Sequence, residues 1–243
     1  MERLLGKFDF EDLDITTKAE HYDPPRELRD EIERYWDEAK QVHGEKLWNG
    51  VNYRLDKVRI GNGRTVMQLG TADYKVNFAS KHLAQKIRKL PWELRPRCMY
   101  ISTLLETADQ KYILGLTASS GVHGSTRALV GGILNQDEQL IESGNDLERY
   151  LHKELEEEFG IGTEAIAKSI GVGVYEMGTC RVGVFVHTRL TVSAAEFAQI
   201  VRMNEEHEGY EVMTPLEIAA EAKTADTNIN TGVMLVMRDL GLI

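Results

Sequence analysis

The chain has 243 residues, 42% of them hydrophobic and 28% charged, with only 2 Cys and 5 Pro. This composition is typical of a globular protein and excludes a disulfide-rich scaffold or a wholly disordered chain. The 29 Lys and Arg against 39 Asp and Glu give a net charge of −10, which argues against binding to nucleic acid polymers. No apolar run approaches the roughly 20 residues that span a bilayer, and two free thiols fit a reducing compartment, so we expect a cytoplasmic protein without membrane contact.

The first part of the chain predicts an extended segment followed by helix and strand signals. Residues 6–22 alternate loosely between apolar and polar side chains, which favours an edge strand or an extended arm. The predicted elements that follow are a charged amphipathic helix, two strands around a Gly-Asn-Gly turn and a short basic helix, over residues 26–42, 51–60, 65–69 and 79–89.

The second part of the chain begins at residue 97 and predicts a mixed α/β domain. Its expected strands and helices occupy residues 100–106, 111–116, 146–159, 169–177, 182–192, 194–203, 215–223 and 230–240. A Gly/Ser-rich stretch contains His123 and Ser125, whose polarity is explained by a solvated loop as well as by contact with a substrate. We therefore divide the chain into an α+β extension over 1–96 and an α/β domain over 97–243.

An acidic block in the middle of this domain has a spacing that suggests chemistry. Residues 137–158 contain nine acidic and two basic side chains, whereas residues 41–136 carry a net charge of +8. On a helix of 100° per residue, Glu154 and Glu158 lie within about 40° of each other, and Glu157 lies about 60° from Glu154. Three carboxylates beside the apolar stripe of a helix repel one another unless a cation joins them. A hard divalent cation accounts for the pattern, and a solvated helix face is the alternative.

These residues resemble the signature of the Nudix hydrolases, G-x5-E-x7-R-E-U-x-E-E-x-G-U, in which U is a bulky aliphatic residue. The opening part matches Gly132 and Glu138, and the closing part matches the run from Glu154 to Ile161. Two features differ from the signature. Lys153 takes the place of the arginine before Glu154, which loses the bidentate guanidinium fork, and the spacer before Lys153 has 14 residues instead of 7.

The resemblance covers residues 98–240 and implies a Nudix-type α/β/α sandwich with a mixed sheet, here preceded by the N-terminal α+β extension. Residues 47–55 and 69–75 of that extension resemble the region before the Nudix domain in the animal Nudix enzymes that hydrolyse UDP-glucose and UDP-galactose. The implied activity is hydrolysis of a nucleoside diphosphate linked to another moiety, and a nucleotide sugar such as a UDP-sugar is the expected substrate.

The resemblance also implies a metal centre. Glu154, Glu157 and Glu158 are the implied ligands of Mg²⁺, or of Mn²⁺ in its place, and act as catalytic residues. Lys153 is the fourth implied catalytic residue, expected to hold a carboxylate such as Glu138 by an ion pair, unless it is an ordinary surface lysine.

The expected substrate contacts lie before the acidic block. Arg127 stands where many Nudix enzymes place a phosphate-binding base, and an ordinary charge at the end of a strand is the alternative. Gly131 and Gly132 let the backbone approach a phosphate or a metal closely, and a plain β-bulge is the alternative. The general base stays open between the acidic block and a later cluster of Glu205, Glu206, Glu208 and Glu211.

Two other interpretations of the function stay open. The first is an ADP-ribose pyrophosphatase, usually a homodimer with a swapped N-terminal arm, for which residues 8–15 are a candidate. The second is a Nudix-like sensor that binds a nucleotide without turnover, which Lys153 and the long spacer suggest.

Overall fold

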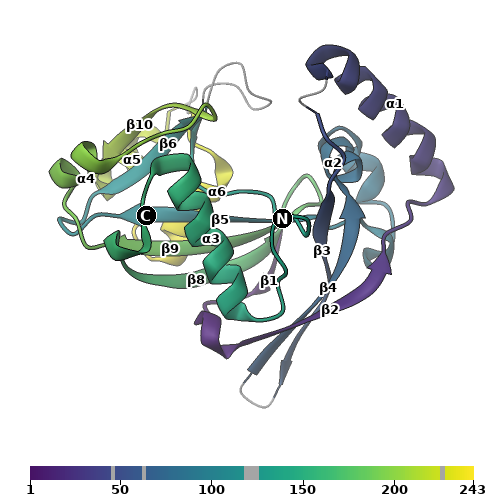
Figure 1. The fold of residues 1–243 in the computed structure, drawn as a ribbon, viewed down its shortest axis with the longest axis horizontal. Coiled ribbons are helices and arrows are strands. Elements are labelled where there is room, and N and C mark those ends of the chain that lie inside the picture. Colours follow the sequence, from purple (N-terminus) through teal and green to yellow (C-terminus); the bar gives the residue numbers. More distant parts are fainter. Residues whose placement is uncertain (45–46, 62–63, 118–125, 225–227) are drawn as a thin grey trace.

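A mixed β-sheet forms the centre of the larger part of the molecule (Figure 1). The computed structural model describes residues 1–44, 47–61, 64–117, 126–224 and 228–243. Within these residues, seven strands pair in the order β1-β8-β9-β5-β6-β10, with β7 beside β6. β5 runs parallel to β9, and the other pairs are antiparallel. The strands are β1 (Glu2–Leu5), β5 (Met99–Glu106), β6 (Tyr112–Thr117), β7 (Arg127–Ala128), β8 (Ile166–Glu176), β9 (Val182–Leu190) and β10 (His207–Met213).

Helices cover both faces of this sheet. The helices of this part are α3 (Gly144–Phe159), α4 (Ala194–Ile200), α5 (Pro215–Glu221) and α6 (Thr231–Asp239). Successive side chains of a strand point to opposite faces, so Val184 and Val186 of β9 pack in the cluster that contains Leu147 of α3. Phe185, between them, packs in the cluster that contains Val236 of α6. The structure is therefore a helix/sheet/helix sandwich, and the expected α/β fold with a mixed sheet is confirmed.

The helix that carries the acidic block has clear local signals at both ends. The side chain of Ser143 accepts a hydrogen bond from the backbone N–H of Asp146 at 3.2 Å and caps the N-terminus. Gly160 ends the helix in the left-handed conformation at φ 67°. Between these ends, Leu147, Leu151 and other apolar side chains at helical spacing are buried, which fixes the rotation of α3 about its axis.

The N-terminal residues build a second, smaller sheet with two helices beside it (Figure 1). Its strands pair in the order β2-β4-β3, with β2 (Leu13–His21) parallel to β4 (Arg64–Asp73), and β3 (Val51–Gly61) antiparallel to it. The helices are α1 (Arg26–His43) and α2 (Tyr74–Ile87), and short 3-10 turns lie at Phe10–Asp12, Trp92–Leu94 and Thr163–Ala165. α1 buries Leu28, Ile32, Trp36 and Ala39 at helical spacing.

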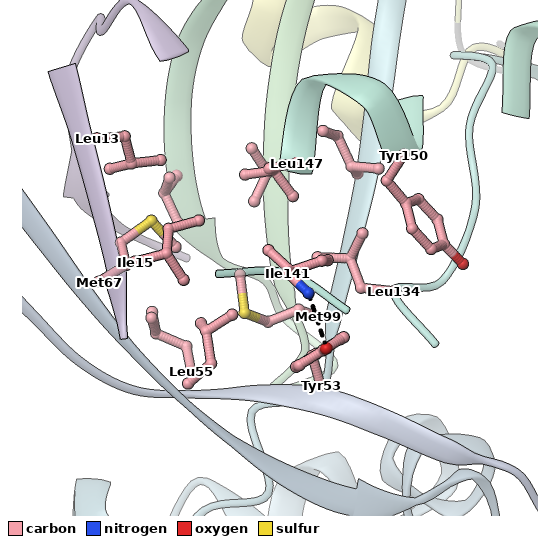
Figure 2. Close-up of a cluster of buried hydrophobic side chains, with 14 of the residues drawn as sticks. Leu13, Ile15, Tyr53, Leu55, Met67, Met99, Leu134, Ile141, Leu147 and Tyr150 are labelled. Atoms are coloured by element: carbon pink, nitrogen blue, oxygen red, sulfur yellow. Dashed lines mark hydrogen bonds between the residues drawn. The ribbon is translucent and has the colours of Figure 1, made fainter. Parts of the chain in front are cut away.

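The two parts share one hydrophobic core. Figure 2 shows Leu13, Ile15, Leu55 and Met67 of the small sheet packed with residues of the domain, such as Leu147. Backbone contacts reinforce this packing, since Tyr53 N donates to Leu134 O at 2.9 Å and Tyr53 Oη accepts from Ile141 N at 3.0 Å. The first strand, β1, belongs to the large sheet. The division of the chain into two parts at residue 96 stays a prediction, and the hydrophobic core contains residues from both sides of it.

Some predicted elements differ from those observed. The segment 6–22 is a 3-10 turn followed by β2, and the helix expected over 79–89 begins at Tyr74, because β4 leads directly into it. The apolar run before Gly131 is a two-residue strand followed by isolated bridges, such as Val130 with Thr103. None of the helices formed by the described residues combines the length and the apolar character needed to cross a membrane.

Candidate functional site

A cavity of about 670 Å³ lies where the N-terminal extension meets the domain. Its volume is in the range of small-molecule sites. One part of its wall is acidic and is formed by Glu138, Glu154, Glu158 and Glu206. Another part comes from the extension and includes Trp48, Asn52 and Tyr74. The cavity therefore depends on both parts of the chain.

The acidic side chains of α3 do not all point into this cavity. Glu154 and Glu158, one turn apart, both line it, as the helical spacing predicts. Glu157 is absent from the described lining, keeps 54% of its side chain exposed and lies 3.5 Å from Lys153 Nζ. Among the described residues, no three His, Cys, Asp or Glu side chains converge closely enough to ligate one ion as they stand.

Crowding of carboxylates changes the chemistry of Glu154. Burial, followed by the charges of Glu158, Glu138 and Glu157, raises the pKa of Glu154 to about 8. A carboxyl group with such a pKa is largely protonated at neutral pH, because ionisation would leave a poorly solvated charge beside other negative charges. This part of the cavity therefore concentrates unfavourable negative charge that a cation would relieve.

Glu158 is the most enclosed of these carboxylates. Its side chain and that of His207, on β10, each expose only 5% of their surface, and His207 Nε2 lies 2.8 Å from Glu158 Oε2. The imidazole also packs edge-on against Phe159, with ring centroids 4.8 Å apart. The other ring nitrogen, Nδ1, is buried without a hydrogen-bond partner in the part of the chain that the structure describes. His207 therefore fixes the orientation of the Glu158 carboxylate.

Gly131 and Gly132 lie against these two carboxylates. Gly131 N donates to Glu158 Oε2 at 3.4 Å, and the carboxylate of Glu154 packs so closely on Gly132 that a Cβ there would overlap it. Gly131 adopts φ 141°, and a Cβ on it would overlap Ile101 O. Glycine is therefore required at 131 by the backbone conformation, whereas at 132 the absence of a side chain lets the Glu154 carboxylate lie against the backbone. Both residues line the cavity, where we expected substrate contacts.

Lys153 and Glu138 form the expected ion pair. Lys153 Nζ lies 2.9 Å from Glu138 Oε2, although the two residues are separated by the long spacer. Tyr150 Oη is 3.1 Å from the same carboxylate oxygen, and Asn135 Nδ2 donates to the other one at 3.1 Å. Burial acts to raise the pKa of Glu138, but these three partners together hold it below its ordinary value. Glu138 is thus kept ionised at the rim of the acidic wall.

The remaining predicted residues lie in different surroundings. Arg127 is paired with Glu211 at 2.7 Å and with Glu221 at 3.2 Å and is not among the described lining residues, so its contact with substrate stays a prediction. Of the late glutamate cluster, Glu206 lines the cavity, and burial followed by the charge of Glu158 raises its pKa. His123 and Ser125 lie outside the described residues.

The structure adds site residues that sequence reasoning did not single out. Tyr150 could have been found, because it lies one helical turn before Glu154 and therefore shares its face. His207 gave no signal, because its partner is 49 residues earlier in the chain. Trp48 and Arg181 also line the cavity. Trp48 lies in residues 47–55, whose resemblance to the region before the Nudix domain gave it no site role, and Arg181 belongs to no motif.

Fold and geometry together define an α/β protein with an acidic cavity bounded by glycine backbone. No known protein family and no curated protein matched the sequence. Among solved structures, the chain is similar to the MutT protein from Methanosarcina mazei Go1, with 18% identity over 59% of this chain and 93% of that chain, at a TM-score of 0.41.

Two further solved structures are similar to this chain over nearly the same fraction of its length. DR0079 from Deinococcus radiodurans has 15% identity over 58% of this chain and 82% of that chain, at a TM-score of 0.45. A NUDIX hydrolase from Nitrosomonas europaea has 16% identity over 59% of this chain and 88% of that chain, at a TM-score of 0.42.

Proposed function

We propose that the protein hydrolyses the pyrophosphate bond of a nucleoside diphosphate linked to another moiety, with a nucleotide sugar such as a UDP-sugar as substrate. The observation that carries the proposal is the pair of Glu154 and Glu158, held side by side in a cavity against the backbone of Gly131 and Gly132. Carboxylates beside a close-approaching backbone are suited to a phosphate that arrives with a divalent cation.

The residues present fit Mg²⁺ or Mn²⁺. Mg²⁺ is usually held by one or two carboxylates and completes its shell with water and substrate phosphate oxygens, so a preformed three-ligand cage is not required. Glu154 and Glu158 would be these carboxylates, and Glu157 would join them after its exposed side chain leaves Lys153. Burial and then the neighbouring carboxylates raise the pKa of Glu154, and a bound cation would offset the repulsion among these carboxylates. When bound, the metal would offset the charge that develops on the phosphates.

The cavity also contains a candidate general base, Glu206. Partial burial followed by the charge of Glu158 raises its pKa above the ordinary value of a glutamate, and it lines the cavity together with Glu154 and Glu158. In the proposed reaction, a water oxygen forms a bond to one phosphorus, the bridging P–O bond breaks, and Glu206 accepts the proton of the water. Gly131 and Gly132 would contact the phosphates, and Lys153 would position Glu138.

The buried free thiols of Cys98 and Cys180 support a cytoplasmic location.

A substrate panel tests the proposal. We expect UDP-glucose to be cleaved to UMP and glucose 1-phosphate in the presence of Mg²⁺ or Mn²⁺ and not in the presence of EDTA, as measured by product mass. ADP-ribose, dinucleoside polyphosphates and NADH in the same panel identify the preferred moiety. Absence of metal-dependent product from every compound, with nucleotide binding retained, would contradict hydrolysis and support the sensor interpretation.

The raised pKa of Glu154 predicts a pH dependence of metal affinity. The metal requires the ionised carboxylate, so binding must displace the proton that Glu154 retains below about pH 8. We expect the affinity for Mn²⁺ to rise by up to about tenfold per pH unit between about pH 6 and 8 and then to level off. Calorimetric titration at several pH values measures this slope, which Glu154→Gln should flatten. A wild-type affinity independent of pH over this range would contradict the assignment.

A further inference from the structure

A second part of the cavity wall is aromatic and contains one cationic side chain. Tyr74, Tyr100 and Trp48 line it, and Arg181 is the only Lys or Arg among its described lining residues. Four glutamates share the cavity with this one guanidinium. The proposed metal site and general base, with the Lys153–Glu138 ion pair, account for the glutamates, so the cation and the aromatic side chains need a separate explanation.

The guanidinium of Arg181 is positioned without being neutralised. It lies over the ring of Tyr100, 5.5 Å from its centroid, and its Nε donates to Thr179 Oγ1 at 3.4 Å. Tyr100 in turn packs so closely on Gly183 that a Cβ there would lie 2.7 Å from the phenol. No carboxylate of the described chain forms an ion pair with Arg181, so most of its donors remain available to a ligand in the cavity.

Trp48 presents an exposed aromatic face on an anchored turn. The side chain is 62% exposed, unusual for an indole, and it lies across Gly50, where a Cβ would overlap it. The turn is held to α2, because Gly50 O accepts from Tyr74 N at 2.8 Å, and to the acidic block, because Asp137 accepts from Val51 N at 2.9 Å. An exposed ring on a fixed backbone can stack on a ligand with little loss of conformational freedom.

Tyr74 connects the two side chains. Its backbone N–H donates to the turn that carries Trp48. Burial raises the pKa of its phenol, the charge of Arg181 opposes that rise, and the charge of Glu206 adds to it. Trp48 and Arg181 therefore both neighbour Tyr74 in the lining of the cavity. A planar group bound there would contact an aromatic ring and an arginine that can only donate hydrogen bonds.

We propose that this aromatic wall binds the nucleobase, with Trp48 stacking on the ring and Arg181 selecting bases with a carbonyl at C4 of a pyrimidine or C6 of a purine. Uracil and guanine present an acceptor at this position, whereas cytosine and adenine carry an amino group there that would face the guanidinium with donors. The inference rests on the proposed hydrolysis and names its substrate class: nucleoside diphosphate derivatives of a keto base. The size of the base, one ring in uracil and two in guanine, would then decide which of these two the cavity accepts.

Matched substrates test this selection. UDP-glucose and CDP-glucose differ only in the hydrogen-bonding edge of the pyrimidine, which has a carbonyl at C4 in uracil and an amino group in cytosine. GDP-glucose and ADP-glucose differ in the corresponding way at C6 of the purine. We expect wild-type kcat/KM to favour the keto member of at least one pair by about tenfold or more. Arg181→Met should reduce that ratio to within about twofold, mainly through KM of the keto substrate. Arg189→Met, at an exposed arginine on β9, is the matched control and should keep the wild-type ratio.

Trp48→Ala separates stacking from edge recognition. Because every base has a stacking face, this variant should lower kcat/KM for all four substrates by about tenfold and leave the keto-to-amino ratio unchanged. A wild-type enzyme indifferent to the base, or an Arg181→Met enzyme with the wild-type ratio, would overturn the inference.

Binding of UMP and CMP, followed by tryptophan fluorescence, separates this inference from the proposed hydrolysis. Selective binding of UMP that Arg181→Met abolishes, without any metal-dependent product, would refute hydrolysis and retain the base site. Product formation with an unchanged ratio in Arg181→Met would refute the base site and retain hydrolysis.

Discussion

Glu158→Gln should lower kcat for the preferred substrate by about 10²- to 10³-fold while leaving the protein folded. Glu158 is the most enclosed carboxylate of the acidic wall, and the substitution removes the charge that would hold the cation. The amide oxygen of Gln can still accept a hydrogen bond from His207, so we expect the free energy of unfolding to change by less than about 1 kcal/mol. Steady-state kinetics and thermal unfolding measure the two effects separately.

Glu156→Gln is the control for this prediction. Glu156 lies on the same helix and has the same chemistry, but it is exposed and points away from the cavity. Its substitution should leave kcat within about twofold of the wild type, since isolated surface changes have small effects. Equal activity of Glu158→Gln and the wild type would contradict the role of Glu158, whereas equal losses in both variants would indicate a general effect of charge.

Gly131→Ala should destabilise the fold by about 3 kcal/mol and lower activity as well. The backbone at φ 141° disfavours any side chain, and the new Cβ would overlap Ile101 O and lie 2.8 Å from Ser102 Cα on β5. The backbone would have to move away from β5, and the N–H that faces Glu158 would move with it. For a chain of this length, we expect the melting temperature to fall by about 6–12 °C.

Gly61→Ala is the matched control for the stability effect. A Cβ added at Gly61 would have no atom within 4 Å, and the residue has no left-handed φ, so the change should stay within about 0.5 kcal/mol. Gly132→Ala gives a third, different result, because the side chain of Glu154 can move away from the new methyl group. It should lower activity more than stability. A melting temperature of Gly131→Ala equal to that of Gly61→Ala would contradict the required glycine conformation.

The periodicity of apolar side chains was sufficient to predict the helix of the acidic block. Apolar side chains four residues apart fixed which face of α3 is buried, and the same geometry placed Glu154 next to Glu158. The pairing of Lys153 with Glu138 also followed from the sequence signature, although the spacer is twice the usual length. Local geometry and a short motif therefore predicted Glu138, Glu154 and Glu158 of the acidic wall, whereas Glu157 of the same motif lies outside the described lining and Glu206 comes from elsewhere in the chain.

Contacts between distant parts of the chain could not be predicted in this way. The partner of Glu158 is His207, on a strand whose position depends on its pairing with β6. The contribution of Trp48 depends on how the extension packs on the domain through a common core, and no local pattern encodes that packing. Residues 6–22 were likewise ambiguous, because a loosely alternating segment does not determine the sheet that it joins.

Mn²⁺ binding measured by electron paramagnetic resonance tests the central claim most directly, because it requires no knowledge of the substrate. At about pH 8, where Glu154 is substantially ionised, the wild type and Glu156→Gln should bind Mn²⁺ with the same affinity. Glu158→Gln should bind it at least about tenfold more weakly. Equal binding of Mn²⁺ by the wild type and Glu158→Gln, or no binding by either, would contradict a metal site on the acidic face of α3.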